Sequence, residues 1–105
     1  MVLRLLIGTA AVLCLAGSAA SAADGAAVFK AQCAKCHGDT GKADTSIGKA
    51  MKVPPLAGDA KIKAMSASEI AGVIKGNAKH PATIKSLSDD DINAVAAFVK
   101  DLAGT

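Results

Sequence analysis

The hydrophobic pattern of the chain changes abruptly near residue 22. Residues 5–17 form an apolar run without a charge, whereas polar and charged residues are interspersed through the rest of the chain. In this second part, apolar residues recur every three or four positions in three stretches, which is the periodicity of amphipathic helices. No stretch shows the strict alternation that marks a half-buried β-strand. The pattern therefore predicts an all-α domain.

Three helices are expected in this domain. The first runs from an N-cap at Asp24 to about Cys36. The second begins with the capping box at 66–69 and ends near Gly76. The third begins at Ser88, where three aspartates suit the positive end of a helix, and runs to about Leu102. The segments between them are expected to be a polar loop over 38–48, a helical turn over 49–53 and an extended loop over 77–87.

Residues 1–22 have the pattern of an export signal. Arg4 is the one charge before the apolar run, and Ala20-Ser21-Ala22 forms an A-x-A cleavage site. We therefore expect residues 1–22 to be removed, together with Cys14, and residues 23–105 to form one domain in the periplasm. An uncleaved membrane anchor is the alternative, since a spanning helix needs about 20 apolar residues. After cleavage the chain is not expected to span a membrane.

The remaining domain has few large apolar side chains. Residues 23–105 contain 18 alanines and only 18 residues that are Val, Ile, Leu, Met or Phe. A domain this short buries about 60% of its unfolded surface and usually needs a disulfide, a metal or another added group. It has 11 lysines spread along its length and no arginine, which does not favour nucleic-acid binding. It is also too small for a large enzyme.

The sequence Cys33-Ala34-Lys35-Cys36-His37 can supply the added group. C-x-x-C-H is the attachment signal of c-type haem. Residues three apart share a helix face, so both thiols can add to the vinyl groups of one porphyrin, and the next histidine can bind the iron. A disulfide here would close too short a loop to stabilise much. A redox pair lacks a βαβ context, and a zinc site lacks a second ligand cluster.

With this motif, residues 23–105 resemble a small bacterial class I cytochrome c over nearly their full length. In that family a glycine and a phenylalanine precede C-x-x-C-H, and the closing helix crosses the first helix with an aliphatic and an aromatic residue. The matching positions are Gly25, Phe29, Val95 and Phe98. We interpret these four as helix-packing residues without a chemical role. The resemblance implies an all-α fold wrapped around one covalently attached haem.

The resemblance also implies roles for the residues of the site. Cys33 and Cys36 would form the haem thioethers, and His37 would be the proximal iron ligand. The family has a P-x-L motif after the haem-binding loop, which corresponds to Pro54-Pro55-Leu56. The Pro54 carbonyl would accept a hydrogen bond from His37, and Leu56 would pack on the haem ring. Such a bond would fix the tautomer of the histidine and raise its basicity.

The sixth iron ligand departs from the usual pattern. Many relatives carry Lys-Met-Pro-Ala before the last helix, with the methionine sulfur on the iron, whereas this chain has Lys79-His80-Pro81-Ala82. His80 is the only histidine besides His37, and we interpret it as the distal ligand. Met51 and Met65 are the competing candidates. Met51 precedes the P-x-L motif, on the wrong side of the loop order, and Met65 is a candidate for core filler.

These residues predict an electron carrier and not an enzyme. Iron bound by two protein side chains has no position for a substrate, and imidazole in place of a thioether favours a comparatively low reduction potential. Contacts with redox partner proteins would be transient and small, with Lys35, Lys79 and Lys85 as candidates for the rim, and the carrier would be a monomer. The alternative is a haem-based sensor or small-ligand binder in which His80 leaves the iron.

Overall fold

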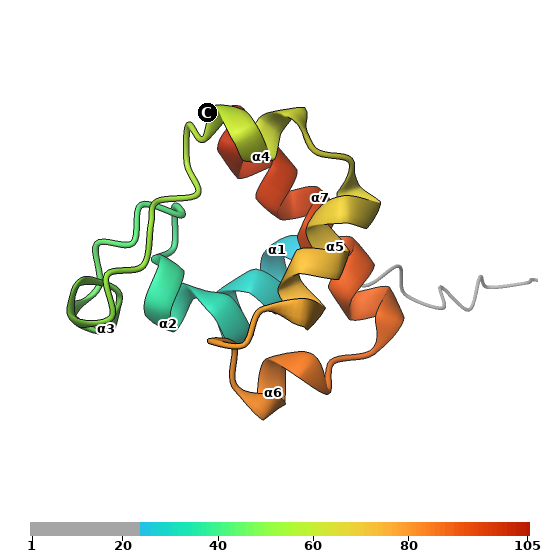
Figure 1. Cartoon of the computed structure of the whole chain (residues 1–105), viewed down its shortest axis with the longest axis horizontal. Helices are drawn as coiled ribbons and strands as arrows, with labels where there is room; N and C mark the ends of the chain where they lie inside the picture. The colour runs from blue at the N-terminus through green and yellow to red at the C-terminus, as the bar shows by residue number, and fades with distance from the viewer. Residues whose placement is uncertain (1–23) are drawn as a thin grey trace, which may run out of the picture.

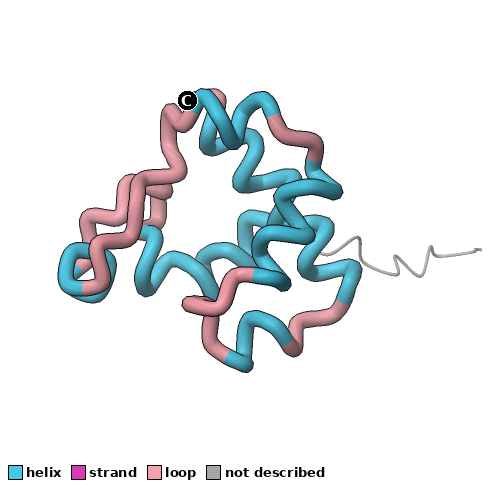
Figure 2. Tube along the Cα trace, viewed as in Figure 1, coloured by secondary structure: helices cyan, strands magenta, loops and turns pink. Residues whose placement is uncertain are grey.

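The structure is a computed structural model that describes residues 24–105. The expected signal over residues 1–22, including Cys14, lies outside the described residues. Within residues 24–105 all regular elements are helices, as Figure 2 shows in cyan. The all-α fold expected from the sequence is therefore confirmed. None of the helices described is long and apolar enough to cross a membrane.

The elements follow one another in Figure 1 from the blue first helix to the red last one. They are α1 (Gly25–Val28), the π-helical stretch η1 (Phe29–Cys33), α2 (Ala34–His37), α3 (Ser46–Ala50), α4 (Ala60–Ala64), α5 (Ala67–Gly76), α6 (Ala82–Lys85) and α7 (Asp89–Ala103). The elements α1, η1 and α2 join end to end and form the expected first helix. The other two expected helices are α5 and α7.

Side-chain caps begin the three expected helices where the sequence places them. The Asp24 carboxylate accepts hydrogen bonds from two backbone N–H groups of α1. Ser66 and Glu69 exchange bonds between side chain and backbone, which completes the capping box of α5. The Ser88 hydroxyl accepts the Asp91 N–H at the start of α7. These contacts are local in sequence, which is why the helix starts are predictable.

The expectations for the connecting segments are partly wrong. The helical turn expected at 49–53 lies at Ser46–Ala50, because the Thr45 hydroxyl accepts the Gly48 N–H and caps it earlier. The chain after it turns at Lys52, whose φ is +54°. Helix α4 was not expected, nor was α6 within the segment 77–87 expected to be extended. Both are single turns, too short to show a helical hydrophobic period.

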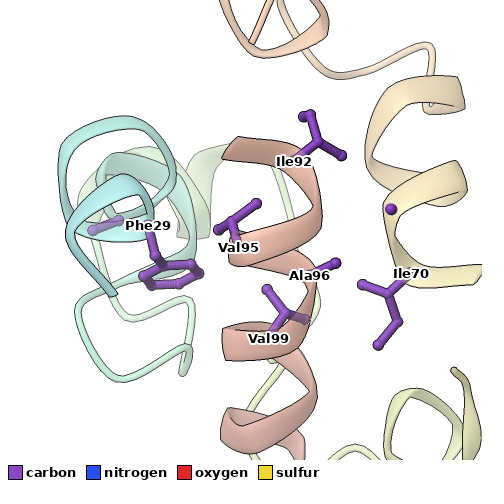
Figure 3. Packing of buried hydrophobic residues seen from close by; sticks show 8 residues of the cluster. Phe29, Ile70, Ile92, Val95, Ala96 and Val99 are labelled. Atoms are coloured by element: carbon purple, nitrogen blue, oxygen red, sulfur yellow. The ribbon is translucent and has the colours of Figure 1, made fainter. Parts of the chain in front are cut away.

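The core lies on both sides of α7. Figure 3 shows Phe29 of the first helix on one side of α7 and Ile70 of α5 on the other. Val95 of α7 is fully buried, and Phe29 is 1% exposed. The Phe29 ring also packs on Phe98, with 5.2 Å between ring centroids. Of the four residues interpreted as helix packing, Phe29 and Val95 lie in the core and Phe98 packs against it; Phe29 and Val95 also reach the cavity described below.

Gly25 lets the first helix approach α7 closely. A Cβ atom at Gly25 would lie 2.2 Å from the carbonyl oxygen of Ala94 in α7. No side chain fits at that distance, so glycine is needed for this crossing. The crossing fixes the direction of the helix that carries the C-x-x-C-H motif.

Candidate functional site

A cavity of about 680 Å³ lies between the first helix, α5 and the loops that follow them. Ligand sites in proteins are typically clefts of about 300–1,000 Å³ with mainly apolar walls. Its apolar wall includes Ile62, Ile70, Ile74, Val95 and Val99. All six residues expected to hold the cofactor line it, namely Cys33, Cys36, His37, Pro54, Leu56 and His80. The structure therefore brings the predicted site residues together.

The two cysteines reach the cavity from the C-terminal half of the first helix. Cys33 ends the π-helical stretch, and Cys36 lies one turn later in α2. Both are free thiols. Burial, and then the neighbouring Cys36, raise the pKa of Cys33 to about 11, so its thiol is protonated at neutral pH. Two half-buried free thiols on one helix are available to form thioethers.

His37 is the last residue of α2, and it also faces the cavity. Burial, and then the proximity of His80, lower the pKa of His37 below its usual value. The imidazole is thus kept neutral, as a metal ligand must be. Its Nδ1 is buried and has no hydrogen-bond partner in this structure. The bond to the Pro54 carbonyl is not formed here, so the role of Pro54 stays a prediction, although Pro54 lines the same cavity.

The loop after His37 returns to the first helix through local hydrogen bonds. Gly38 begins it with a φ of +79°, a conformation that favours glycine. The Thr45 hydroxyl donates to the Cys36 carbonyl at 3.1 Å. The Gly41 carbonyl accepts the Leu56 N–H at 2.7 Å. Leu56, expected to pack on the haem ring, is thereby held at the cavity wall.

His80 enters the cavity from the connection between α5 and α6. Its Nδ1 lies 2.7 Å from the Ile74 carbonyl oxygen. Because a carbonyl can only accept, Nδ1 carries the proton and donates it. The lone pair of the neutral ring is then on Nε2. Fixing one ring nitrogen as a donor is how proteins prepare the other nitrogen as a metal ligand.

The His37 and His80 rings lie close to each other at the cavity. Their centroids are 6.2 Å apart, and their planes make an angle of 71°. When two imidazole nitrogens bind one metal from opposite sides, each about 2 Å from it, the ring centroids lie about 6 Å apart. The spacing therefore fits a single iron between the two rings. With the thiols and the apolar walls, the residues present fit a covalently attached haem.

The competing ligands also reach the cavity. Met51 and Met65 both line it; Met51 is 54% exposed, and Met65 packs against the core. Met65 comes directly before α5, and Lys100 donates a hydrogen bond to its carbonyl. A zinc site would need several ligands, but residues 24–105 contain no group of three or more His, Cys, Asp or Glu side chains able to hold a metal ion.

The rim of the cavity is basic. Lys35 and Lys79 line it as expected, and so does Lys52, but Lys85 is not among the lining residues. No Asp or Glu in the described part of the chain lines the cavity. Lys52 was not expected here, because it reaches the cavity through a backbone with positive φ, which is rare for lysine. Val73 of α5, an exposed apolar residue, also lines the cavity.

Comparison with known proteins identifies relatives of most of the described domain. Residues 20–99 match the family described as cytochrome C oxidase, cbb3-type, subunit III. The chain is 37% identical to cytochrome c6 of Leptolyngbya boryana over 80% of this chain and 95% of that protein. It is 35% identical to cytochrome c6 of Synechocystis sp. over 81% of this chain and 68% of that protein.

A third relative is a much longer protein. The chain is 32% identical to the cbb3-type cytochrome c oxidase subunit CcoP of Azospirillum brasilense over 82% of this chain. It spans only 30% of the length of that subunit. The similarity thus concerns only part of the oxidase subunit.

Proposed function

The chain belongs to the family of small monohaem class I cytochromes c, and from that premise we propose that it is an exported electron carrier whose iron is bound by His37 and His80. Members of this family carry a covalently bound c-type haem and transfer electrons, so the protein is an electron carrier and not an enzyme. The bound haem supplies a one-electron couple of ferric and ferrous iron.

The proposal assigns each site residue a task. Cys33 and Cys36 form the two thioethers, and both thiols already line the cavity on one helix. His37 is the proximal ligand. Its Nδ1, which is buried without a hydrogen-bond partner, would donate a hydrogen bond to the Pro54 carbonyl once the haem is bound. Leu56 packs on the macrocycle from a loop that is tied down at Gly41. Residues 1–22 form the cleaved signal that precedes this domain.

One observation carries the assignment of the sixth ligand. The centroids of the His80 and His37 rings are 6.2 Å apart, and the His80 Nδ1 is held by the Ile74 carbonyl. Because the His80 Nδ1 donates to that carbonyl, Nε2 is the ring nitrogen available to bind a metal. A second imidazole saturates the iron, and it stabilises the ferric state more than a methionine sulfur does. We therefore propose a comparatively low reduction potential for this carrier.

The basic rim indicates how the carrier meets its partners. Lys35, Lys52 and Lys79 surround the mouth of the cavity, together with the exposed side chains of Met51 and Val73. A small apolar surface with a ring of charge suits brief contacts with redox proteins, which bury little area. We propose that the protein works as a monomer in the periplasm and docks through this rim.

The ligand assignment is tested with His80→Ala. The unaltered ferric protein is expected to be low-spin, and its ferrous form inert to carbon monoxide, because both axial positions are taken. His80→Ala is expected to give high-spin iron and rapid carbon monoxide binding. Rapid binding by the unaltered protein would favour a sensor of small molecules instead. An unchanged ferric spectrum in His80→Ala would show that another residue, such as Met51 or Met65, is the ligand.

A further inference from the structure

The C-terminal end of α5 holds the ring of His80. Helices end with carbonyl groups that lack partners within the helix. In α5 the Val73 carbonyl accepts the Asn77 N–H at 2.9 Å, and the Ile74 carbonyl accepts Nδ1–H of His80 at 2.7 Å. The histidine thus closes the end of the helix that precedes it. The same bond fixes the rotation of its ring.

Asn77 shapes the turn that delivers His80 to this carbonyl. Its side-chain oxygen accepts the Lys79 N–H at 2.9 Å. Its backbone carbonyl accepts the His80 N–H at 3.0 Å. Asparagine commonly makes such turns, because its side chain mimics a backbone acceptor. With both bonds the chain folds back at once after α5, and His80 reaches a residue six positions earlier.

We propose that Asn77 is a positioning residue that sets the ring plane of His80 relative to that of His37. The inference rests on the proposed function, because it takes His80 as the sixth ligand. The two ring planes make an angle of 71°. Without the hydrogen bond that the Asn77 side chain accepts from the Lys79 N–H, the turn loosens. The His80 ring is then no longer held against the Ile74 carbonyl. The ring then rotates toward other angles about its bond to the iron.

The angle between axial imidazole planes has a spectroscopic signature. In low-spin ferric haem, near-perpendicular imidazoles leave two iron orbitals close in energy, which gives an electron paramagnetic resonance signal with one very large g value. Near-parallel imidazoles separate these orbitals and give a rhombic spectrum with three resolved g values. Secondary structure and stability do not set this signal, so it reports the ring angle itself.

The test compares four haem-loaded proteins by low-temperature electron paramagnetic resonance: the unaltered chain, Asn77→Ala, Asn77→Asp and Asn93→Ala. The unaltered chain is expected to show the single large g value. Asn77→Ala is expected to shift toward the rhombic spectrum, or to broaden into a mixture. Asn77→Asp keeps an acceptor for the Lys79 N–H and is expected to retain the original signal. Asn93→Ala removes an exposed asparagine of α7 and is the matched control.

Each other outcome overturns the inference. A rhombic spectrum from the unaltered chain would contradict near-perpendicular planes of the His37 and His80 rings. An Asn77→Ala spectrum identical to the original contradicts the positioning role, and so does an Asn77→Asp spectrum shifted as far as that of Asn77→Ala. His80→Ala separates the two proposals: if it leaves the signal unchanged, the ligand assignment itself fails. If it abolishes the signal while Asn77→Ala has no effect, only the role of Asn77 fails.

Discussion

The rings of His37 and His80 lie 6.2 Å apart across the cavity that both cysteines line. The two residues come from different parts of the fold, since His37 ends the first helix and His80 follows α5. Helix α7 shares the core with residues of the first helix and of α5. The relative position of these two histidines thus depends on the packing of the core as well as on the local motif.

Removing both thiols is expected to prevent stable folding. In Cys33→Ala/Cys36→Ala the haem cannot be attached, and the few large apolar residues are left around an unfilled cavity. As with structural metals, loss of the bound group then costs folding free energy. Circular dichroism and a haem assay after periplasmic expression are expected to show little helical protein and no covalent haem. A cooperative, stably helical double mutant without haem would contradict this account.

Replacing the sixth ligand is expected to raise the reduction potential. His80→Met puts a thioether on the iron, which favours the ferrous state. The increase is expected to be on the order of 0.1 V, within the span of about 0.8 V that axial ligands can set. Redox titration measures it, and the ferric spectrum is expected to gain the sulfur-to-iron charge-transfer band. A potential that does not rise, despite that band, would argue against the proposed tuning by His80.

The close crossing of the first helix and α7 is expected to tolerate no side chain at residue 25. In Gly25→Ala the new methyl group meets the Ala94 carbonyl, where a Cβ would lie at 2.2 Å. Overpacking of this kind typically costs about 1–3 kcal/mol of unfolding free energy. The control is Gly72→Ala in α5, where a Cβ has no neighbour within 4 Å.

Urea unfolding of the haem-loaded proteins measures the change in unfolding free energy for each of the two substitutions. Gly72→Ala is expected to be neutral or to stabilise by about 0.5–1 kcal/mol, since alanine has less freedom to lose than glycine in a helix. Equal effects of the two substitutions would mean that the helix crossing does not require glycine.

The ion pair between Lys75 and Asp89 is expected to make stability depend on pH. The hydrogen bond and the charge of Lys75 lower the pKa of Asp89 below its usual value. A lowered pKa adds stability at pH values above the unfolded pKa, and this stability is lost as the pH falls through the folded pKa. The pair is exposed at the surface, so its effect is small and weakened by salt.

Urea unfolding at several pH values tests this pair. Asp89→Asn is expected to lower the unfolding midpoint at neutral pH and to approach the unaltered protein in acid, where both carry no charge at this position. Asp90→Asn removes a neighbouring charge from the same first turn of α7 and controls for the helix dipole. If both substitutions lower the midpoint equally at neutral pH, the ion pair contributes nothing.

Helix starts and the covalent motif could be predicted because their signals are local. Asp24, Ser66 and Ser88 each cap a helix within three residues of sequence. The C-x-x-C-H spacing likewise places both thiols on one helix, whatever the rest of the chain does. The family resemblance placed His80 in the loop before the last helix, and the structure brings its ring near that of His37; its role as ligand stays a prediction.

The rest depends on contacts between distant segments or on single turns. The hydrogen bond between His80 and the Ile74 carbonyl arises from the fold-back after α5, which no hydrophobic period reveals. Helices α4 and α6 are one turn long, and α6 begins after Pro81 without a side-chain cap that would mark its start. Lys52 reaches the cavity rim through a backbone with positive φ, which is rare for lysine and hence not expected.

The central claim is that two histidines bind the iron of the oxidised protein. Near-infrared magnetic circular dichroism measures it directly, because the energy of the porphyrin-to-iron charge-transfer band differs between histidine–histidine, histidine–methionine and histidine–lysine pairs. The unaltered ferric protein is expected to show the band of a histidine–histidine pair. A band of the histidine–methionine pair, or high-spin iron with an open position, would contradict the account.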